Sequence, residues 1–127
     1  RTQPLKPNAL AWESGTGASS LFYGLEASLT LLKETGLDRI EKHLGSLSDE
    51  LCERLAAKEY EIVSSREAGE KSAIVCIRHR SGLDCNSIAE RLIAENIVVS
   101  PRNDVLRIAP HFFNNSGDIE RLIEALP

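Results

Sequence analysis

The residue with the clearest chemical potential is Arg107, which lies inside the apolar run Val105-Leu106-Arg107-Ile108-Ala109. Strand alternation places Arg107 on one face together with Val105 and Ala109. A guanidinium among small apolar neighbours is costly to bury without an anion, and its planar fork fits a carboxylate or a phosphate through two parallel hydrogen bonds. Arg107 is therefore a candidate anion-binding residue. From the pattern alone, the alternative is a structural ion pair or an arginine whose stem covers apolar surface at a sheet edge.

The other reactive side chains form no recognisable site. The three cysteines, Cys52, Cys76 and Cys85, lack the spacing of a zinc site, and the three histidines are scattered. We expect Cys52 and Cys76 to be small buried hydrophobic residues. Cys85 stands at a helix start, where a thiol can be acidified, but no histidine or asparagine arrangement points to it as a nucleophile. The sequence thus predicts no metal site and a reducing, cytoplasmic location.

Composition limits the classes of function. With 127 residues, 42% of them hydrophobic, the chain can form one domain with a real core. Its net charge is -4 with both signs interspersed, so no basic surface for nucleic acid is expected. No apolar run reaches membrane-spanning length and no signal peptide is visible. The chain starts with Arg1 and contains no methionine, so we expect a piece of a longer protein.

Helical patterns occupy the first half of the chain. Residues 1–18 have no clear period and are predicted to be an extended segment or linker, which leaves 19–127 as the domain. Leucines at helical spacing predict a helix from Ser19 to a stop at Gly36. A second apolar seam runs from Ile40 to Leu55. Two adjacent amphipathic helices need a surface to cover, and a sheet from the later part is the expected partner.

Strands and shorter helices fill the second half. The predicted strands are Tyr60–Ser64, Ala73–Arg78, Ile97–Ser100 and Val105–Ala109, and the predicted helices are Asp84–Glu95 and Ser116–Leu126. Ile74 is expected to be buried in its strand, and Ile93 on the buried face of its helix. Asn115 and Asp118 have the spacing of a capping box, which would fix the strand end that aims Arg107. The order predicts an α+β fold: a small, mainly antiparallel sheet of about four strands with helices packed on one face, preceded by a helical pair.

Five segments in order, from about Ala11 to Leu126, carry a family resemblance. They are Trp12-Glu13-Ser14-Gly15-Thr16, Gly24-Leu25-Glu26-Ala27-Ser28-Leu29, Gly36-Leu37-Asp38-Arg39-Ile40-Glu41-Lys42-His43, Glu95-Asn96-Ile97-Val98-Val99-Ser100 and the stretch from Leu106 to Asn115. Together they resemble the C-terminal, small domain of pyridoxal-phosphate enzymes of fold type I. The closest resemblance is to the class V aminotransferase group, which includes cysteine desulfurases, lyases and epimerases.

The resemblance implies a role for two residues. The position of Arg107 holds the substrate α-carboxylate in such enzymes, and that of Thr16 contacts a phosphate of the cofactor, often in the neighbouring subunit of a dimer. The Schiff-base lysine and the aspartate that pairs with the pyridine nitrogen belong to the large domain that precedes this segment. The chain would therefore hold no catalytic residue and be inactive alone, while its parent binds pyridoxal phosphate, an amino-acid substrate and a second copy of itself.

The sequence departs from the family pattern at two places. The desulfurase group carries a cysteine in the loop before the arginine strand, whereas residues 101–104 here contain none, so an aminotransferase, lyase or epimerase fits better. Gly17 stands where many relatives have proline, next to Thr16. The alternative function is a stand-alone amino-acid-binding regulatory module or a dimerisation module of the same α+β class, in which Arg107 would bind a carboxylate without chemistry.

Overall fold

The computed structural model describes residues 8–12, 15 and 17–127, and these residues form two compact units, 1–36 and 37–127. The first unit contains a short 3-10 helix, η1 (Ala9–Trp12), and the helix α1 (Ser19–Thr35). The predicted helix from Ser19 is confirmed. Gly36 follows it with φ 90°, a conformation that glycine adopts without strain, and its N–H bonds to the carbonyl of Leu32 at 3.0 Å. The helical η1 was not expected in the stretch predicted to be extended.

The second unit holds three helices and the four strands found among the described residues. Its helices are α2 (Leu37–Leu55), α3 (Cys85–Ala94) and α4 (Ser116–Ala125). Asp84 caps α3 by accepting a hydrogen bond from the N–H of Ser87 at 3.0 Å. The predicted capping box of Asn115 and Asp118 is present at the start of α4. Among the described residues, no helix has both the length and the apolar character needed to cross a membrane.

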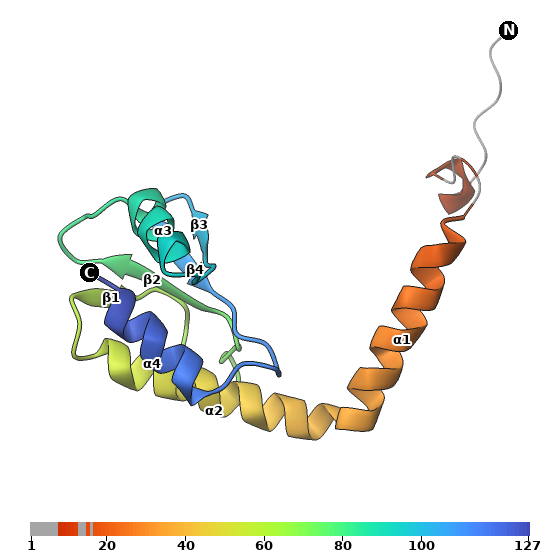
Figure 1. The fold of residues 1–127 in the computed structure, drawn as a ribbon, viewed down its shortest axis with the longest axis horizontal. Coiled ribbons are helices and arrows are strands. Elements are labelled where there is room, and N and C mark those ends of the chain that lie inside the picture. Colours follow the sequence, from red (N-terminus) through yellow and green to blue (C-terminus); the bar gives the residue numbers. More distant parts are fainter. Residues whose placement is uncertain (1–7, 13–14, 16) are drawn as a thin grey trace, which may run out of the picture. The chain divides into compact units, whose positions relative to one another are not determined.

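The four strands form one antiparallel sheet in the order β1-β2-β4-β3 (Figure 1). They are β1 (Tyr60–Ile62), β2 (Val75–His79), β3 (Ser100–Arg102) and β4 (Val105–Ile108). The strand β4 is central, with β2 on one side and β3 on the other. Helices cover one face, and the predicted α+β class with its antiparallel sheet is confirmed.

The core lies between the helices and one face of the sheet. Alternation along β2 and β4 sends Val75, Ile77, Leu106 and Ile108 into it, because every second side chain of a strand points to the same face. The helices contribute Leu47, Leu51, Leu55, Ile88, Ala89, Leu92, Ile119, Leu122 and neighbouring apolar residues. The opposite face of the sheet carries Cys76, Arg78 and Arg107, which are only half-buried. We call this second surface the open face.

The structure corrects several local expectations. Ile74 lies just before β2 and is 41% exposed, so it is not a core residue. Ile93 is 57% exposed, because the buried side of α3 is formed by residues one helical turn apart, such as Ile88 and Leu92. The strand before the β-turn is Ser100–Arg102 rather than residues 97–100. Its proline is tolerated because β3 lies at a sheet edge, where one row of N–H groups is not needed for pairing.

Candidate functional site

Arg107 lies on β4, in the middle of the open face. In the sheet register it stands opposite Cys76 of β2 and Ser100 of β3, so two short side chains flank it on the neighbouring strands. Its Nε atom is buried and has no hydrogen-bond partner among the residues that the structure describes. Within the same residues, its guanidinium forms none of the ion pairs found on this surface. A buried N–H donor left unpaired is costly, so Arg107 is a candidate to bind an anion.

Arg78 shows how the same face treats an arginine that has a structural role. Its Nη2 lies 2.7 Å and its Nε 2.9 Å from Oδ2 of Asp104, and its Nη1 lies 3.2 Å from Oε2 of Glu61. The hydrogen bond to Asp104, followed by the attraction of the Asp104 charge, raises the pKa of Arg78 above its ordinary value. Glu61 stands directly opposite Arg78 across β1 and β2. Arg78 is thus neutralised by two carboxylates, whereas Arg107 has none among the described residues.

The turn before β4 is closed and holds no free thiol. It consists of Asn103 and Asp104, and Asn103 adopts a positive φ of 52°, which asparagine tolerates better than most residues. The carbonyl of Asn103 accepts a hydrogen bond from the Sγ of Cys85 at 3.2 Å. Cys85 is buried and engaged in the core, so it does not face the surface that carries Arg107. Cys52 and Cys76, which were expected to be buried, are both only half-buried.

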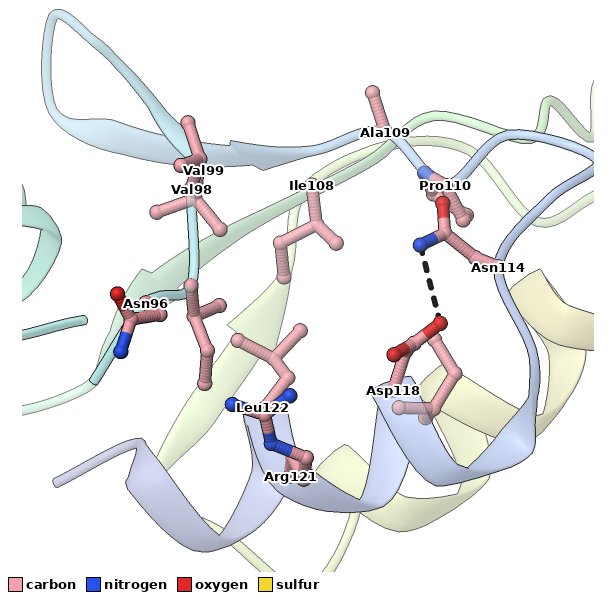
Figure 2. Close-up of a pocket in the computed structure, with 12 residues that line it drawn as sticks. Asn96, Val98, Val99, Ile108, Ala109, Pro110, Asn114, Asp118, Arg121 and Leu122 are labelled. Atoms are coloured by element: carbon pink, nitrogen blue, oxygen red, sulfur yellow. Dashed lines mark hydrogen bonds between the residues drawn. The ribbon is translucent and has the colours of Figure 1, made fainter. Parts of the chain in front are cut away.

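The end of β4 is held by polar contacts from the turn that follows it. Asn114 Nδ2 donates to Asp118 Oδ2 at 3.2 Å, and the backbone N–H of Asn115 donates to the same oxygen at 3.0 Å. These contacts lower the pKa of Asp118, with the Asn114 hydrogen bond as the larger cause. His43 of α2 lies 2.9 Å from the Asn114 carbonyl through its Nε2, which must carry the proton because a carbonyl only accepts. Figure 2 shows Asn114 and Asp118 facing each other.

The proposed cofactor contact is in a different part of the chain. Thr16 lies outside the described residues, so its predicted role is a prediction still. Its neighbours Gly15 and Gly17 are exposed.

Two of the lysines have structural partners: Lys58 Nζ donates to the Leu126 carbonyl and Lys71 Nζ to Asp49, each at 3.0 Å. Neither lysine is poised as a free amine.

Sequence reasoning missed the contacts of Arg78 and of Asn114. The contact between Arg78 and Glu61 could have been predicted from strand alternation, because each residue stands between buried or half-buried residues of its own strand. The contact from His43 to Asn114 joins residues 71 positions apart, and no local pattern announces it. The site therefore contains one predicted residue, Arg107, whereas the contacts of Arg78 and of Asn114 are seen only in the folded chain.

Comparison with known proteins gives the family. The model of the class V aminotransferase family matches residues 2–115, and the chain belongs to this family. Over 140 aligned residues it is 24% identical to the uncharacterized aminotransferase YcbU of Bacillus subtilis, an alignment that covers 96% of this chain and 37% of YcbU.

Solved structures share the fold. The cysteine desulfurase of Thermococcus onnurineus NA1 matches with a TM-score of 0.82 at 21% identity, over 91% of this chain and 32% of that protein. The cysteine desulfurase CsdA of Escherichia coli matches with a TM-score of 0.77 at 18% identity, over 89% and 31%. The cystine C-S lyase C-DES matches with a TM-score of 0.78 at 20% identity, over 90% of this chain and 30% of that protein. One C-DES variant has glycine linked covalently to its PLP (pyridoxal phosphate) cofactor. The chain thus spans about a third of the length of these proteins.

Proposed function

We propose that this chain is the small domain of a class V PLP enzyme that acts on an amino acid, and that Arg107 binds the α-carboxylate of the substrate. The observation that best supports this proposal is the buried Nε of Arg107, which has no hydrogen-bond partner among the described residues. On the same face, Arg78 is bound by two carboxylates. A surface that neutralises one arginine and leaves its neighbour open supports a role for the open one in binding an anionic ligand.

Arg107 would act by orientation. A carboxylate held through two parallel hydrogen bonds has a fixed position, and this fixes which bond at the substrate Cα faces the cofactor. PLP, when bound in the parent, supplies the electron sink for charge that develops at that carbon. Closure of the small domain over the site would exclude water and complete the arrangement. Arg107 itself neither takes nor gives a proton in this role.

The remaining parts of the site would come from outside the described residues. We assign the cofactor phosphate contact to Thr16, and the Schiff-base lysine to the portion of the parent that the family resemblance places before this chain, so the chain alone would be inactive. Transamination, lyase or epimerase chemistry is favoured over desulfurase chemistry, because the turn Asn103-Asp104 carries no cysteine. We expect the parent to be a cytoplasmic homodimer, with three free thiols in keeping with a reducing location.

The helix α1 supports a larger parent. None of its residues is buried, and Phe22, Leu25 and Leu29 line an apolar groove along it together with Glu26, Thr30 and Lys33. An isolated helix of this length is marginal in water, and an exposed apolar strip of this kind marks an interaction surface. Since the chain spans 37% of YcbU, we assign this groove to the large cofactor-binding domain of the same polypeptide.

The test uses the full-length parent and a pair of small probes. Aminooxyacetate and O-methylhydroxylamine both react with the cofactor through an aminooxy group, but only the first carries a carboxylate. The ratio of their affinities therefore measures the carboxylate preference of the site. We expect Arg107→Ala to lower this preference about 100-fold or more, as expected for loss of a charge-assisted bidentate contact. The visible absorbance of the bound cofactor should be retained.

Arg78→Ala is the matched control, because it removes an arginine from the same face of the neighbouring strand. It should leave the carboxylate preference unchanged. An Arg107→Ala parent with the wild-type preference would overturn the proposal. Calorimetry of the isolated chain with a panel of amino acids separates the alternative: tight, selective binding without the rest of the parent would indicate a stand-alone module.

A further inference from the structure

Asn114 uses every polar atom it has. Its N–H donates to the carbonyl of His111 at 2.9 Å, and its Oδ1 accepts from the N–H of His111 at 2.9 Å. Its Nδ2 donates to Asp118 of α4, and its carbonyl accepts from His43 of α2. One half-buried side chain and its peptide thus tie the turn after β4 to two helices that lie far apart in sequence.

Asn114 follows the point at which the sheet no longer holds β4. The ladder with β2 ends at Ile108, which stands opposite Val75. Ala109 and Pro110 then carry the chain to the turn, and proline has no N–H to donate. Arg107 is therefore one residue from the last ladder pair. The position of this strand end depends on what fixes the segment beyond it.

Packing on the helix side does not fix it fully. A cavity of about 170 Å³ lies against the strand end, lined by Ile108, Ala109 and Pro110, by Asn114, and by residues of α4 and of the segment before β3 (Figure 2). This pocket is open to solvent, so close packing does not hold its walls in place. The hydrogen bond between Asn114 and Asp118 spans part of the cavity wall (Figure 2). The four hydrogen bonds of Asn114, which we call the clamp, supply the restraint that close packing does not.

The clamp also orders an exposed aromatic turn. The rings of His111 and Phe113 stack with centroids 4.9 Å apart, and that of Phe112 lies 4.8 Å from His111. Phe113 is 73% exposed. Ala109 and His111 are exposed, whereas Ile108 is buried and Pro110 is half-buried. Four hydrogen bonds on one residue that hold a solvent-facing turn indicate a preorganised element.

We propose that Asn114 is a positioning residue for the carboxylate site: it fixes the end of β4, and through it the aim of the Arg107 guanidinium. The proposal rests on the proposed function of Arg107. Loss of the clamp lets the strand end move toward the cavity, and a displacement of about 1 Å at a binding group can cost up to ~100-fold. Asn114 does not touch the substrate in this role.

The test compares Asn114→Ala with Asp84→Ala in the full-length parent. Asp84→Ala is matched, because it removes a side chain that accepts backbone and side-chain hydrogen bonds at the start of another helix. With aminooxyacetate and O-methylhydroxylamine as probes, Asn114→Ala should lower the carboxylate preference by about 10-fold to 100-fold. Asp84→Ala should leave the preference unchanged. Hydrogen exchange of the ladder amides of β4 should become faster in Asn114→Ala alone.

Further variants make the outcome decisive. Arg107→Ala combined with Asn114→Ala should show the preference of Arg107→Ala, since the positioning acts through Arg107. If Asn114→Ala does not fold, His43→Ala removes one of the four bonds and should give a smaller fall of the same kind. A wild-type preference in the folded clamp variants, with a lowered one in Arg107→Ala, would overturn the positioning role alone. A wild-type preference in Arg107→Ala would overturn the proposed function itself.

Discussion

The helix-covered face of the sheet and its open face each hold one buried polar atom without a hydrogen-bond partner among the described residues. On the covered face it is the hydroxyl oxygen of Tyr60, which is 3% exposed and whose ring meets His79 edge-on at 4.8 Å. On the open face it is Nε of Arg107. The phenol is neutral and burial raises its pKa to about 12, so the core tolerates it. A guanidinium stays charged, so leaving its buried donor unpaired is more costly than leaving a phenol unpaired.

A second contrast lies within the open face. Arg78 and Arg107 are on adjacent strands, two residues apart in register, because Cys76 stands opposite Arg107. Asp104 and Glu61 reach Arg78 but not Arg107. Both contrasts support the same rule. An unpartnered polar atom indicates a ligand only where it is charged and where the nearby carboxylates already pair with a neighbouring residue.

Charge reversal at Arg107 should give the largest effect. Arg107→Glu places a carboxylate where the substrate carboxylate is proposed to bind, so attraction is replaced by repulsion. We expect the carboxylate preference of the parent, measured with the aminooxyacetate pair, to fall by about 1,000-fold or more, equivalent to about 4 kcal/mol. Arg78→Glu is the control and should keep the preference. Equal losses in the two variants would show that the net charge of the face matters, and not the position of Arg107.

The covered side of β4 should dominate stability. Leu106 is 1% exposed and adjoins Arg107 in the chain, whereas Val105 is half-buried and points to the open face. Leu106→Ala should lower the free energy of unfolding of this chain by about 2–5 kcal/mol, since a core cavity is left behind. Val105→Ala should cost less than half as much. Chemical denaturation followed by circular dichroism measures both, and similar losses would contradict the division between the faces.

Local patterns were sufficient for most of the fold. Apolar seams and helix-start signals located α1, α2, α3 and α4, and the capping box at Asn115 was read from spacing alone. Short strands were shifted by one to three residues, because pairing partners decide where a ladder begins and ends. Ile74 illustrates this: its β-branched side chain fits a strand, but the ladder begins at Val75.

The site was predictable only at Arg107. An arginine in an apolar run violates the local pattern, and such violations are visible in sequence. Its freedom from carboxylates depends on where Glu61 and Asp104 lie, and the clamp at Asn114 depends on His43. These are contacts between residues 17 to 71 positions apart, set by strand order and helix packing. No single segment encodes them.

Tyr60 offers an alkaline test of the covered face. Its pKa in the folded chain is raised to about 12 by burial, while an unfolded tyrosine titrates near pH ~10. A raised folded-state pKa stabilises the fold below pH ~10, and this contribution is lost as the pH rises toward ~12. Tyr60→Phe should therefore abolish a fall in the free energy of unfolding over this range. At pH 7 it should be neutral or stabilise by up to about 1 kcal/mol, since the hydroxyl has no partner among the described residues. Retention of the alkaline fall in Tyr60→Phe would assign it to another group.

Freeing Arg78 should give the smallest effect and the sharpest test of the open face. The double variant Glu61→Gln and Asp104→Asn keeps both shapes but removes both counter-charges from Arg78. Stability should change little, because exposed ion pairs contribute little and are screened by salt. The carboxylate preference of the parent should also stay within about twofold, because Arg78 keeps its place on β2 and Arg107 keeps its own on β4. A clear rise in preference would mean that any unpaired arginine on this face can capture the carboxylate. The selectivity would then come from the absence of counter-charges, and not from the register that sets Arg107 between Cys76 and Ser100.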